Sequence, residues 1–238
     1  MNVSNEKLDQ IAEGYDPSDP TRYFDYWFKR FEAKVFASWS VGRKFLELGG
    51  ATGESSSLLS ERADRYVIVE GSTFNVNLLT KRLPHCEVVH AFWEEFVTEE
   101  LFTDIILFET LEHYHDPVSL LQTCRRWLEP GGRIHLSVPN GLSLHRQVGV
   151  ELGLMKSPTD LIDSDTAQGH LRNYSLESLR ADVRQAGLEV VHEQGLFLKL
   201  VPNSMMLDWK PELIWAINEL AKDRPHESAE IYLVCESK

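Results

Sequence analysis

A glycine-rich turn near residue 50 constrains the fold of this chain more than any other feature of the sequence. A strand-like segment, Phe45–Leu48, runs directly into Gly49, Gly50 and Gly53, and apolar residues of helical character follow. Glycine permits a positive φ and lets a ligand approach the main chain, while the N-terminus of the next helix leaves free N–H groups beside the same crevice. The order strand, glycine turn, helix therefore predicts a nucleotide-binding corner.

A carboxylate lies at the end of the next expected strand. The apolar segment Tyr66–Val69 is followed by Glu70 and Gly71. They come about 20 residues after the turn, the position at which an acidic side chain accepts hydrogen bonds from the two hydroxyls of a ribose. We therefore expect Glu70 to bind a ribose and Gly71 to lie beside it.

The spacing of the turn separates two classes of ligand. Glu47, Gly49, Ala51 and Gly53 follow one another at intervals of two and lack the G-x-G-x-x-G order that places a pyrophosphate on a helix N-terminus. The carboxylate of Glu47 would repel a pyrophosphate, but it suits a ligand that carries an ammonium and a sulfonium. The turn thus favours S-adenosylmethionine (SAM) over a dinucleotide, with an NAD-linked oxidoreductase as a less favoured alternative.

Strands and helices alternate over residues 44–140, which predicts a parallel sheet with right-handed crossovers. We expect an α/β fold, a doubly wound, mostly parallel seven-stranded sheet, in a single domain over residues 1–238. Residues 1–41 would form a helical cap, 141–172 a lid inserted after strand five, and 173–238 the rest of the sheet. The expected strands are Lys44–Leu48, Tyr66–Val69, Glu87–Val89, Asp104–Phe108, Arg133–Val138, Leu188–His192 and 229–235.

The N-terminal cap contains aromatic residues at helical spacing. Apolar side chains recur from Phe24 to Val35, after a plausible N-cap at Thr21, so an amphipathic helix packed on the sheet is the plainer interpretation. The alternative is that Tyr15, Tyr23 or Trp27 closes over the ligand.

Composition excludes some partners. The net charge of −13 argues against a nucleic-acid surface, and the three cysteines include no C-x-x-C pair. The N-terminus lacks the pattern of a signal peptide and no apolar run reaches about 18 residues. We expect a cytoplasmic protein, a monomer or homodimer with a small-molecule acceptor as its partner, that binds neither membrane nor nucleic acid.

Ligands of an open α/β sheet bind outside the carboxyl ends of its strands. Phe92 and Trp93 follow the third expected strand and offer flat apolar surface for an adenine, although Trp93 could equally fill the edge of the sheet. Phe108 and Glu109 end the fourth strand. We expect these four residues to contact the cofactor.

Three segments resemble the class I SAM-dependent methyltransferases. Glu47–Gly53 resembles their first motif, E/D-x-G-x-G-x-G, with Ala51 in place of the middle glycine. The segment Phe108–His113, followed by Asp116 and Pro117, is similar to that of the ubiquinone-biosynthesis type, and Leu128–Asn140 looks like its Leu-x-Pro-Gly-Gly strand. The resemblance implies a Rossmann-like methyltransferase fold. It also implies that Glu47, Gly49, Gly53 and Glu109 surround the methionine end of SAM, Glu70 the ribose, and Phe92 and Trp93 the adenine.

The region beyond residue 140 is similar to a narrower set of bacterial methyltransferases, which are associated with sugar, polysaccharide or secondary-metabolite pathways. The similarity covers 140–146, 153–155 and 169–175. It implies methyl transfer to an oxygen or nitrogen but names no acceptor. A non-catalytic SAM-binding regulatory subunit is the alternative, because the sequence assigns no single catalytic base, and a fold that catalyses by proximity alone has the same sequence features as an inactive one.

Methyl transfer is an in-line displacement, so the protein mainly holds the acceptor at near-attack distance. A hydroxyl or a protonated amine also needs a general base, for which histidine is suited near neutral pH. Of four competing histidines we favour His113, His145 and His170 over His115. Each could instead be structural, or part of a solvated loop.

The lid also carries cationic side chains. Arg146 and Arg172 each lie beside a histidine, and paired hydrogen bonds from guanidinium would suit an anionic acceptor. Tyr23, Trp27 and Tyr174 complete the expected acceptor site. His113-x-His115 on a loop is a weak metal signal, so we expect transfer without a metal.

Overall fold

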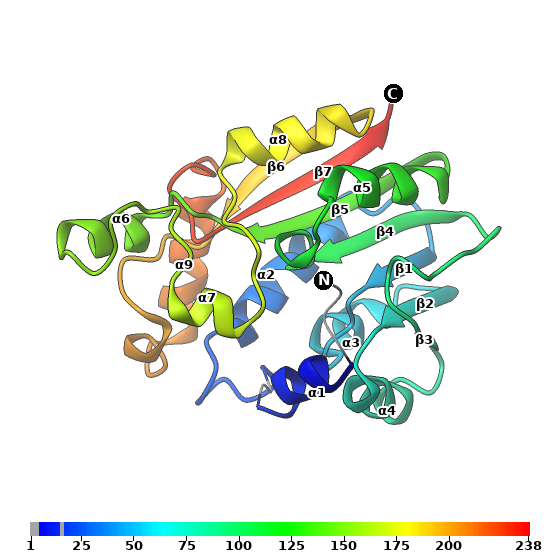
Figure 1. Ribbon diagram of the computed structural model, residues 1–238, viewed down its shortest axis with the longest axis horizontal. Coiled ribbons are helices and arrows are strands. Elements are labelled where there is room, and N and C mark those ends of the chain that lie inside the picture. The colour runs from blue at the N-terminus through cyan, green and yellow to red at the C-terminus, as the bar shows by residue number, and fades with distance from the viewer. Residues whose placement is uncertain (1–4, 15–16) are drawn as a thin grey trace.

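The computed structural model describes residues 5–14 and 17–238. A seven-stranded sheet lies at its centre in the order β3-β2-β1-β4-β5-β7-β6, and only β7 runs antiparallel to its neighbours (Figure 1). This confirms the predicted doubly wound, mostly parallel sheet. The strands are β1 (Lys44–Leu48), β2 (Arg65–Glu70), β3 (Glu87–His90), β4 (Phe102–Phe108), β5 (Leu128–Pro139), β6 (Leu188–Leu196) and β7 (Glu230–Ser237).

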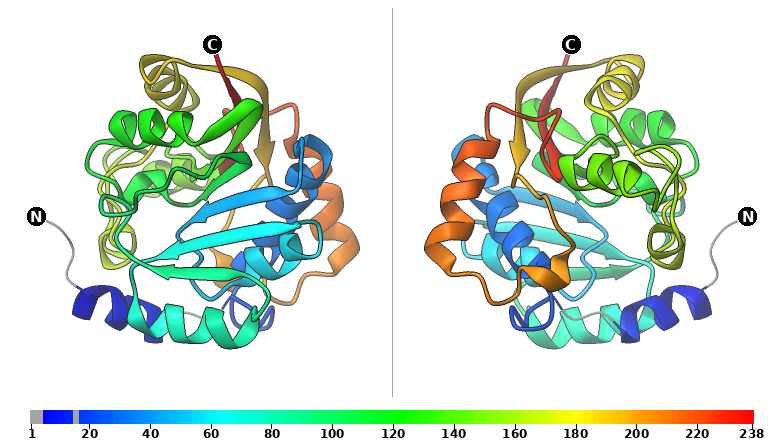
Figure 2. Two further views of the ribbon diagram at one scale, coloured as in Figure 1. Left: turned by 90° about the vertical axis from the view of Figure 1, so that its right-hand side faces the viewer. Right: turned by 90° about the vertical axis from the view of Figure 1, so that its left-hand side faces the viewer.

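Helices cover both faces of this sheet. Figure 2 shows α5 and α8 on one face and α2 and α9 on the other. The α-helices are α1 (Asn5–Glu13), α2 (Asp25–Trp39), α3 (Glu54–Ser60), α4 (Thr73–Arg82), α5 (Pro117–Arg126), α6 (Leu144–Glu151), α7 (Asp163–Ala167), α8 (Leu176–Gln185) and α9 (Pro211–Ala221), with 3₁₀ turns at η1 (Leu111–His113) and η2 (Asn203–Met205). In the described part of the chain, no helix combines the length and apolar composition needed to cross a membrane.

Two apolar layers result from the alternation of side chains along the strands. Leu46 and Leu48 belong to the cluster with α5 and α8, whereas Phe45, the residue before Leu46, packs in the cluster with α2 and α9. The central strand β4 is almost continuously apolar because both of its faces are buried. The centre of the sheet therefore has no face exposed to solvent. Polar groups gather at the amino and carboxyl ends of the strands, which we call the amino edge and the carboxyl edge of the sheet.

Three boundaries differ from the sequence prediction. Strand β5 begins at Leu128 because it pairs with Phe102 before an irregularity in the ladder, and β6 continues past His192 to Leu196 along β7. Helix α2 begins at Asp25, since the Thr21 hydroxyl donates to Asp19 (2.7 Å) in a preceding turn.

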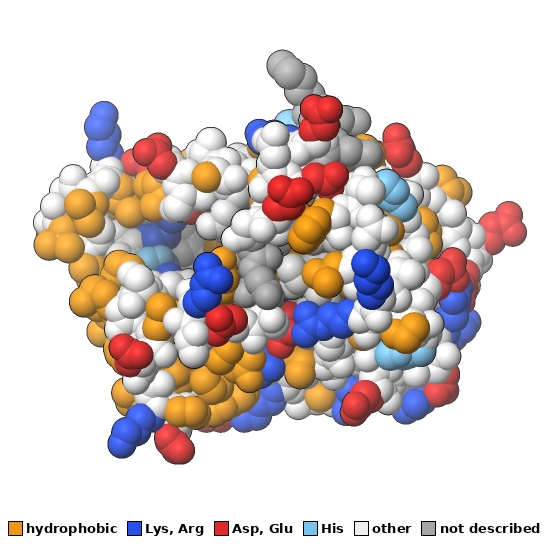
Figure 3. Space-filling model, turned by 90° about the horizontal axis from the view of Figure 1, so that it is seen from below, with side chains coloured by type: hydrophobic (Ala, Val, Ile, Leu, Met, Phe, Trp, Pro, Cys, Tyr) orange, Lys and Arg blue, Asp and Glu red, His pale blue; other side chains and the backbone are white. Residues whose placement is uncertain are grey.

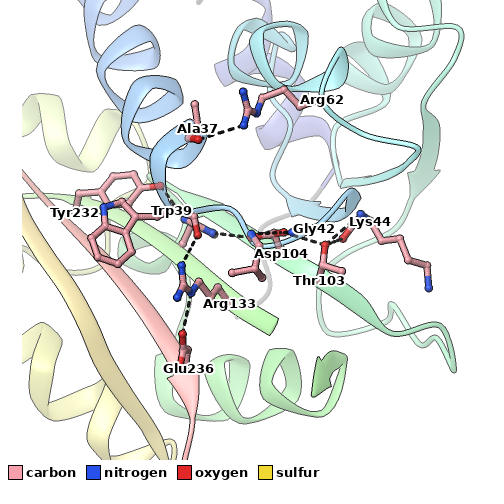
Figure 4. Close-up of polar contacts among 12 residues, drawn as sticks. Ala37, Trp39, Gly42, Lys44, Arg62, Thr103, Asp104, Arg133, Tyr232 and Glu236 are labelled. Carbon is pink, nitrogen blue, oxygen red and sulfur yellow. Dashed lines mark hydrogen bonds and ion pairs between the residues drawn. The ribbon is translucent and has the colours of Figure 1, made fainter. Parts of the chain in front are cut away.

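The amino-terminal edge of the sheet is held by a polar network (Figure 4). The buried carboxylate of Asp104 accepts hydrogen bonds from the N–H groups of Val41 (3.0 Å) and Gly42 (3.1 Å), and Nε2 of His135 lies 3.0 Å from it. Arg133 donates to the carbonyl of Trp39 (2.8 Å). These contacts fix the connection from α2 into β1.

Residues 141–172 cross the carboxyl edge of the sheet and contain α6 and α7 (Figure 1). At the start of this segment Asn140 pairs with Tyr174, and the N–H of Gly141 donates to the Tyr174 carbonyl (2.7 Å). At its end the N–H of Leu171 donates to the carbonyl of Glu112 (2.8 Å). The predicted lid is thus fastened to the strand ends on both sides.

Candidate active site

A cavity of about 240 Å³ opens at the carboxyl ends of β1, β2 and β4. Helix α1 and the end of the lid close its other sides. Its position agrees with the rule that ligands of α/β sheets bind where the strands end. The cavity is lined by Lys7, Leu8, Ile11, Ala12, Gly49, Ala51, Thr52, Glu70, Gly71, Ser72, Asn75, Phe92, Trp93, Glu94, Glu109, Thr110, His113, Tyr114, His115, Gln168 and Gly169.

The glycine turn forms the floor of this cavity. Gly49 has φ +86°, and a Cβ there would lie 3.1 Å from Cζ2 of Trp93. Glycine is therefore needed both for the backbone conformation and for the approach of the indole. Ala51, which stands where the methyltransferase motif has glycine, adopts φ +45°.

Glu70 fastens the turn to the end of β2. Its carboxylate accepts hydrogen bonds from the N–H groups of Ala51 (2.9 Å) and Ser72 (2.8 Å), and the residue is 7% exposed. Burial raises the pKa of Glu70 more than these hydrogen bonds lower it. Glu70, the residue predicted to bind the ribose, thus lines the cavity and also holds the turn that forms its floor.

Phe92 and Trp93 form an aromatic wall of the cavity, and their contact with an adenine stays a prediction. The Trp93 ring stacks on Tyr114, with centroids 6.0 Å apart and planes at 28°. Phe92 contacts the floor, since a Cβ on Gly71 would lie 3.4 Å from its ring. The wall offers the flat apolar surface that an adenine would use.

Glu109 lines the cavity where β4 ends. Its φ is +49°, and Lys29 of α2 donates a hydrogen bond to its carboxylate. Burial alone would raise the pKa of Glu109, but the charge and hydrogen bond of Lys29 outweigh it and leave the pKa below the ordinary value. A fixed negative charge therefore faces this end of the cavity.

Glu47 does not line the cavity. Its carboxylate is 2% exposed and accepts hydrogen bonds from Ser56 (2.5 Å) and Tyr66 (2.8 Å). Burial raises its pKa to about 7. The structure thus places Glu47 between β1, β2 and α3, where it joins these elements rather than meeting the ligand space.

Three other predicted cofactor residues also lie outside the cavity. A Cβ on Gly50 would lie 2.5 Å from Ile68, and one on Gly53 would lie 2.7 Å from Leu79, so these glycines permit packing against β2 and α4. The side chain of Phe108 faces Tyr232 in the core, because alternation along β4 turns it away from the cavity.

Two of the candidate bases meet beside the cavity. The rings of His113 and His170 contact each other with centroids 4.8 Å apart, and only His113 is among the lining residues. Burial lowers the pKa of His113 to about 4 and also lowers that of His170. Both rings are therefore neutral near pH 7 and can accept a proton.

His145 lies elsewhere in the lid. Its Nδ1 is 3.0 Å from the hydroxyl of Ser143, and it does not line the cavity. Burial, assisted by Lys199 and Arg146, lowers its pKa to about 3. Its predicted role as a base stays a prediction, with less geometric support than that of His113.

Glu112, His113 and His170 could hold a metal ion, because one ligand atom from each lies within 4.8 Å of the others. Glu112 is 1% exposed, and within the described chain neither of its carboxyl oxygens has a hydrogen-bond partner. Nε2 of His113 is 3.9 Å from one of them. Transfer without a metal stays a prediction.

The side chains expected to contact the acceptor are occupied within the fold. Arg146 donates to the carbonyls of Pro158 and Asp160 and lies 3.2 Å from Asp165. Arg172 donates to the carbonyl of His115 (3.0 Å). Arg146 therefore organises the lid, and Arg172 joins the lid to the loop after η1.

The aromatic candidates are also placed away from the cavity. Tyr174 is 2% exposed and donates to Asp182 (3.0 Å), and the Tyr23 hydroxyl donates to the carbonyl of Gly14 (2.9 Å). Trp27 packs against Trp215 of α9. Tyr15 lies outside the described residues. The plainer interpretation of α2, a helix packed on the sheet, therefore fits Trp27.

Sequence reasoning missed the contribution of α1 and of the end of the lid. Leu8, Ile11 and Ala12 reach the cavity from α1, and Gln168 and Gly169 reach it from the lid. The apolar spacing of Leu8, Ile11 and Ala12 is a helical signal that was available in the sequence. The lid residues carried no comparable signal.

A second depression lies beside the lid. Seen from below, the surface is hollowed at the left, with basic and histidine side chains inside and hydrophobic side chains around it (Figure 3). Exposed apolar residues of α6 and α9 include Val148 and Leu213.

Comparison with known proteins identifies the family. A family model described as a methyltransferase domain matches residues 13–193, about three quarters of the chain. The chain belongs to this methyltransferase family. The match includes the glycine turn, the ends of β2 and β4, and the whole of the lid.

Individual relatives are distant. A probable SAM-dependent methyltransferase of Mycolicibacterium smegmatis is 26% identical over 176 residues, which cover 73% of this chain and 63% of the relative. A ubiquinone biosynthesis O-methyltransferase of Pseudomonas aeruginosa is 28% identical over 168 residues, covering 66% of this chain and 68% of the relative. Against Rv3030 of Mycobacterium tuberculosis, a probable SAM-dependent methyltransferase, the match is 26% over 122 residues, or 50% of this chain. The chain spans 63% and 44% of the lengths of the two mycobacterial relatives.

Among solved structures, the CcbJ methyltransferase from Streptomyces caelestis is similar over the whole chain. Its TM-score is 0.67 at 18% identity, and the match covers 100% of this chain and 99% of that one. At this identity the likeness concerns the fold.

Proposed function

We propose that this protein transfers a methyl group from SAM to an oxygen or nitrogen atom of a small-molecule acceptor, of the kind found among sugars or secondary metabolites. The observation that carries the proposal is the cavity at the strand ends, which brings Glu70, Trp93 and Glu109 around a glycine turn. The family supports the same reaction.

Each part of the cavity has a role in this proposal. Glu70 binds the ribose hydroxyls, and Phe92 and Trp93 hold the adenine. Glu109 faces the ammonium and sulfonium charges of the methionine end, where its negative charge is favourable. Glu47 of β1 does not contact the cofactor directly. It holds β1 against β2 and α3 through its hydrogen bonds with Tyr66 and Ser56.

The acceptor end of the site lies at His113. The donated methyl group would point towards Glu109 and His113, and the neutral imidazole of His113 can take a proton from the acceptor. Because its pKa is about 4, His113 is a weak base, and positioning of the acceptor supplies most of the rate. The anionic acceptor expected from Arg146 and Arg172 has less support, since both guanidinium groups already bind lid and loop groups.

Calorimetric titration with S-adenosylhomocysteine and, separately, with NAD⁺ tests the cofactor. We expect the first ligand alone to bind, and Glu70→Ala to weaken it about 100-fold, because two charge-assisted hydrogen bonds to the turn and those to the ribose are lost. Glu189→Ala, an exposed site on β6, is the matched control and should bind as the wild type does. Binding of NAD⁺, or equal affinity in Glu70→Ala, would refute the assignment.

A further inference from the structure

A closed network of polar contacts surrounds Glu109, the residue that directly follows β4. Lys29 of α2 donates a hydrogen bond to Oε2 of Glu109 and lies 3.5 Å from Glu32, one turn further along the same helix. The N–H of Glu109 donates to the carbonyl of Ser137 in β5 (2.9 Å), and the Ser137 hydroxyl donates to Glu32. Lys29, Glu32 and Ser137 are each at most 9% exposed. The network therefore fastens Glu109 to α2 and to β5.

This network holds Glu109 in a backbone conformation that glutamate rarely adopts. Its φ is +49°, in the left-handed region where a Cβ is disfavoured. Strain of this kind persists where the surrounding structure fixes the residue, and it is typical of functional sites. The contacts with Lys29 and Ser137 provide that fixation, so Glu109 has a defined position where it lines the cavity.

The two carboxyl oxygens of Glu109 differ in their contacts. Oε2 accepts the hydrogen bond from Lys29, whereas Oε1 accepts none from the residues that the structure describes. The Glu109 side chain is 26% exposed and that of Lys29 is 11% exposed. A carboxylate can accept hydrogen bonds at both oxygens, so Oε1 is left for a ligand in the cavity.

Lys29 also keeps this carboxylate charged. Burial alone would raise the pKa of Glu109, and the charge and hydrogen bond of Lys29 lower it below the ordinary value. Removing one partner of a buried ion pair leaves the other charge uncompensated. Without Lys29, the carboxyl groups of Glu109 and Glu32 would lose the cation that lies between them.

We propose that Lys29 is a positioning residue for SAM, which holds Glu109 so that Oε1 receives the positive charge of the methionine end. This inference rests on the proposed function and adds a residue of α2 to the cofactor site. Lys29 does not line the cavity, so it acts through Glu109 and does not touch the cofactor.

Titration of Lys29→Met with S-adenosylhomocysteine and with 5′-methylthioadenosine tests this role. Both ligands contain the adenine and the ribose, but methylthioadenosine lacks the ammonium group. We expect Lys29→Met to weaken binding of S-adenosylhomocysteine about tenfold, the factor for one lost charge-assisted hydrogen bond, and to leave methylthioadenosine unchanged. If Lys29 only repelled the positive charge of the ligand, its removal would strengthen binding of S-adenosylhomocysteine.

A double-mutant cycle, which needs S-adenosylhomocysteine alone, shows whether Lys29 acts through Glu109. Glu109→Gln should weaken binding about tenfold, and adding Lys29→Met should weaken it no further, because residues of one network are not additive. Lys29→Arg retains the charge and the donor and should bind more tightly than Lys29→Met. Lys34→Met is the matched control, since Lys34 lies on the same helix with its side chain 52% exposed and is paired with Glu219 (2.7 Å).

Circular dichroism checks that the variants fold, and Lys29→Gln replaces Lys29→Met in both experiments if the latter does not. The inference is overturned if Lys29→Met binds S-adenosylhomocysteine as tightly as the wild type or more tightly, if methylthioadenosine loses as much affinity, or if the losses in the cycle add. Failure of the wild type to bind S-adenosylhomocysteine would instead refute the proposed function.

Discussion

Buried carboxyl groups at the two edges of the sheet differ in their hydrogen bonding. At the amino edge, Asp104 is fully buried and accepts hydrogen bonds from the N–H groups of Val41 and Gly42. At the carboxyl edge, Glu112 is almost equally buried and accepts none from the described residues. A buried polar group without a partner is destabilising, so the difference separates an edge whose buried carboxyl group is satisfied by the fold from an edge whose buried carboxyl group is left without a partner by the described residues.

The backbone shows the same contrast. Left-handed positions at the amino edge are occupied by glycine, as at Gly131 and Gly187. In the described chain the non-glycine residues with positive φ are Ala51, Glu109 and Phe197, and each follows the end of a parallel strand, at the carboxyl edge. Strain of this kind gathers at functional sites, where the surrounding structure holds it.

The largest effect is expected at Asp104. Asp104→Ala leaves the N–H groups of Val41 and Gly42 and the buried His135 without their acceptor, and should lower the free energy of unfolding by about 3–5 kcal/mol. Urea denaturation measures the change.

Glu112→Gln is the matched substitution at the other edge. It removes no hydrogen bond seen among the described residues, so the free energy of unfolding should stay within about 1 kcal/mol of the wild type. Similar losses in the two variants would contradict the distinction between the edges.

Glu32 should make the stability of the carboxyl edge depend on pH. Burial, with Lys29 acting against it, raises its pKa from 4.5 to about 7 in the folded protein, so the folded state holds the proton more tightly than the unfolded chain. The stabilisation is complete below pH 4.5 and is lost as the pH rises through about 7. Its size is at most about 3 kcal/mol.

Glu32→Gln should therefore reduce the fall in stability between pH 5 and 8, whereas Glu212→Gln should not. Denaturation curves at several pH values provide the comparison. A Glu32→Gln profile that is parallel to the wild-type profile would mean that the Glu32 carboxyl titrates normally in the fold.

The features predicted best from the sequence are those set by the backbone conformation of a short segment. The turn at Gly49 and the carboxylate of Glu70 lie within short segments whose order alone implies the geometry, and the structure places both in the cavity. The alternation of strands and helices likewise predicted the sheet, because each element buries its own apolar face. The strand limits were less certain, since Leu128 enters β5 through pairing with distant Phe102.

The acceptor side could not be predicted in the same way. Whether Arg146 contacts a ligand depends on Asp165 and on backbone carbonyls of the folded lid, which already bind its guanidinium group. The spacing of residues in the sequence does not predict these contacts. Lys29 of α2 interacts electrostatically with Glu112 of η1 and Glu230 of β7, which lie up to about 200 positions away in the sequence, so their proximity exists only in the tertiary structure. Glu47 belongs to a motif that the sequence does reveal, yet its side chain does not reach the cavity. It is directed into the interior by its hydrogen bonds with Ser56 and Tyr66.

A small stabilising effect is expected at Ala51, where the turn departs from the family motif. Its φ of +45° places the Cβ in a conformation that disfavours alanine by about 1–2 kcal/mol, while glycine costs about 0.5–1 kcal/mol more chain entropy on folding. Ala51→Gly should therefore stabilise the protein by up to about 1 kcal/mol, measured by urea denaturation. The matched change at the amino edge, Gly131→Ala, introduces the same strain where no Cβ contact is within 4 Å, and should destabilise by a similar amount. If Ala51→Gly instead destabilised the protein, the strained backbone would be compensated by contacts of the methyl group, and the strain could not be assigned to function.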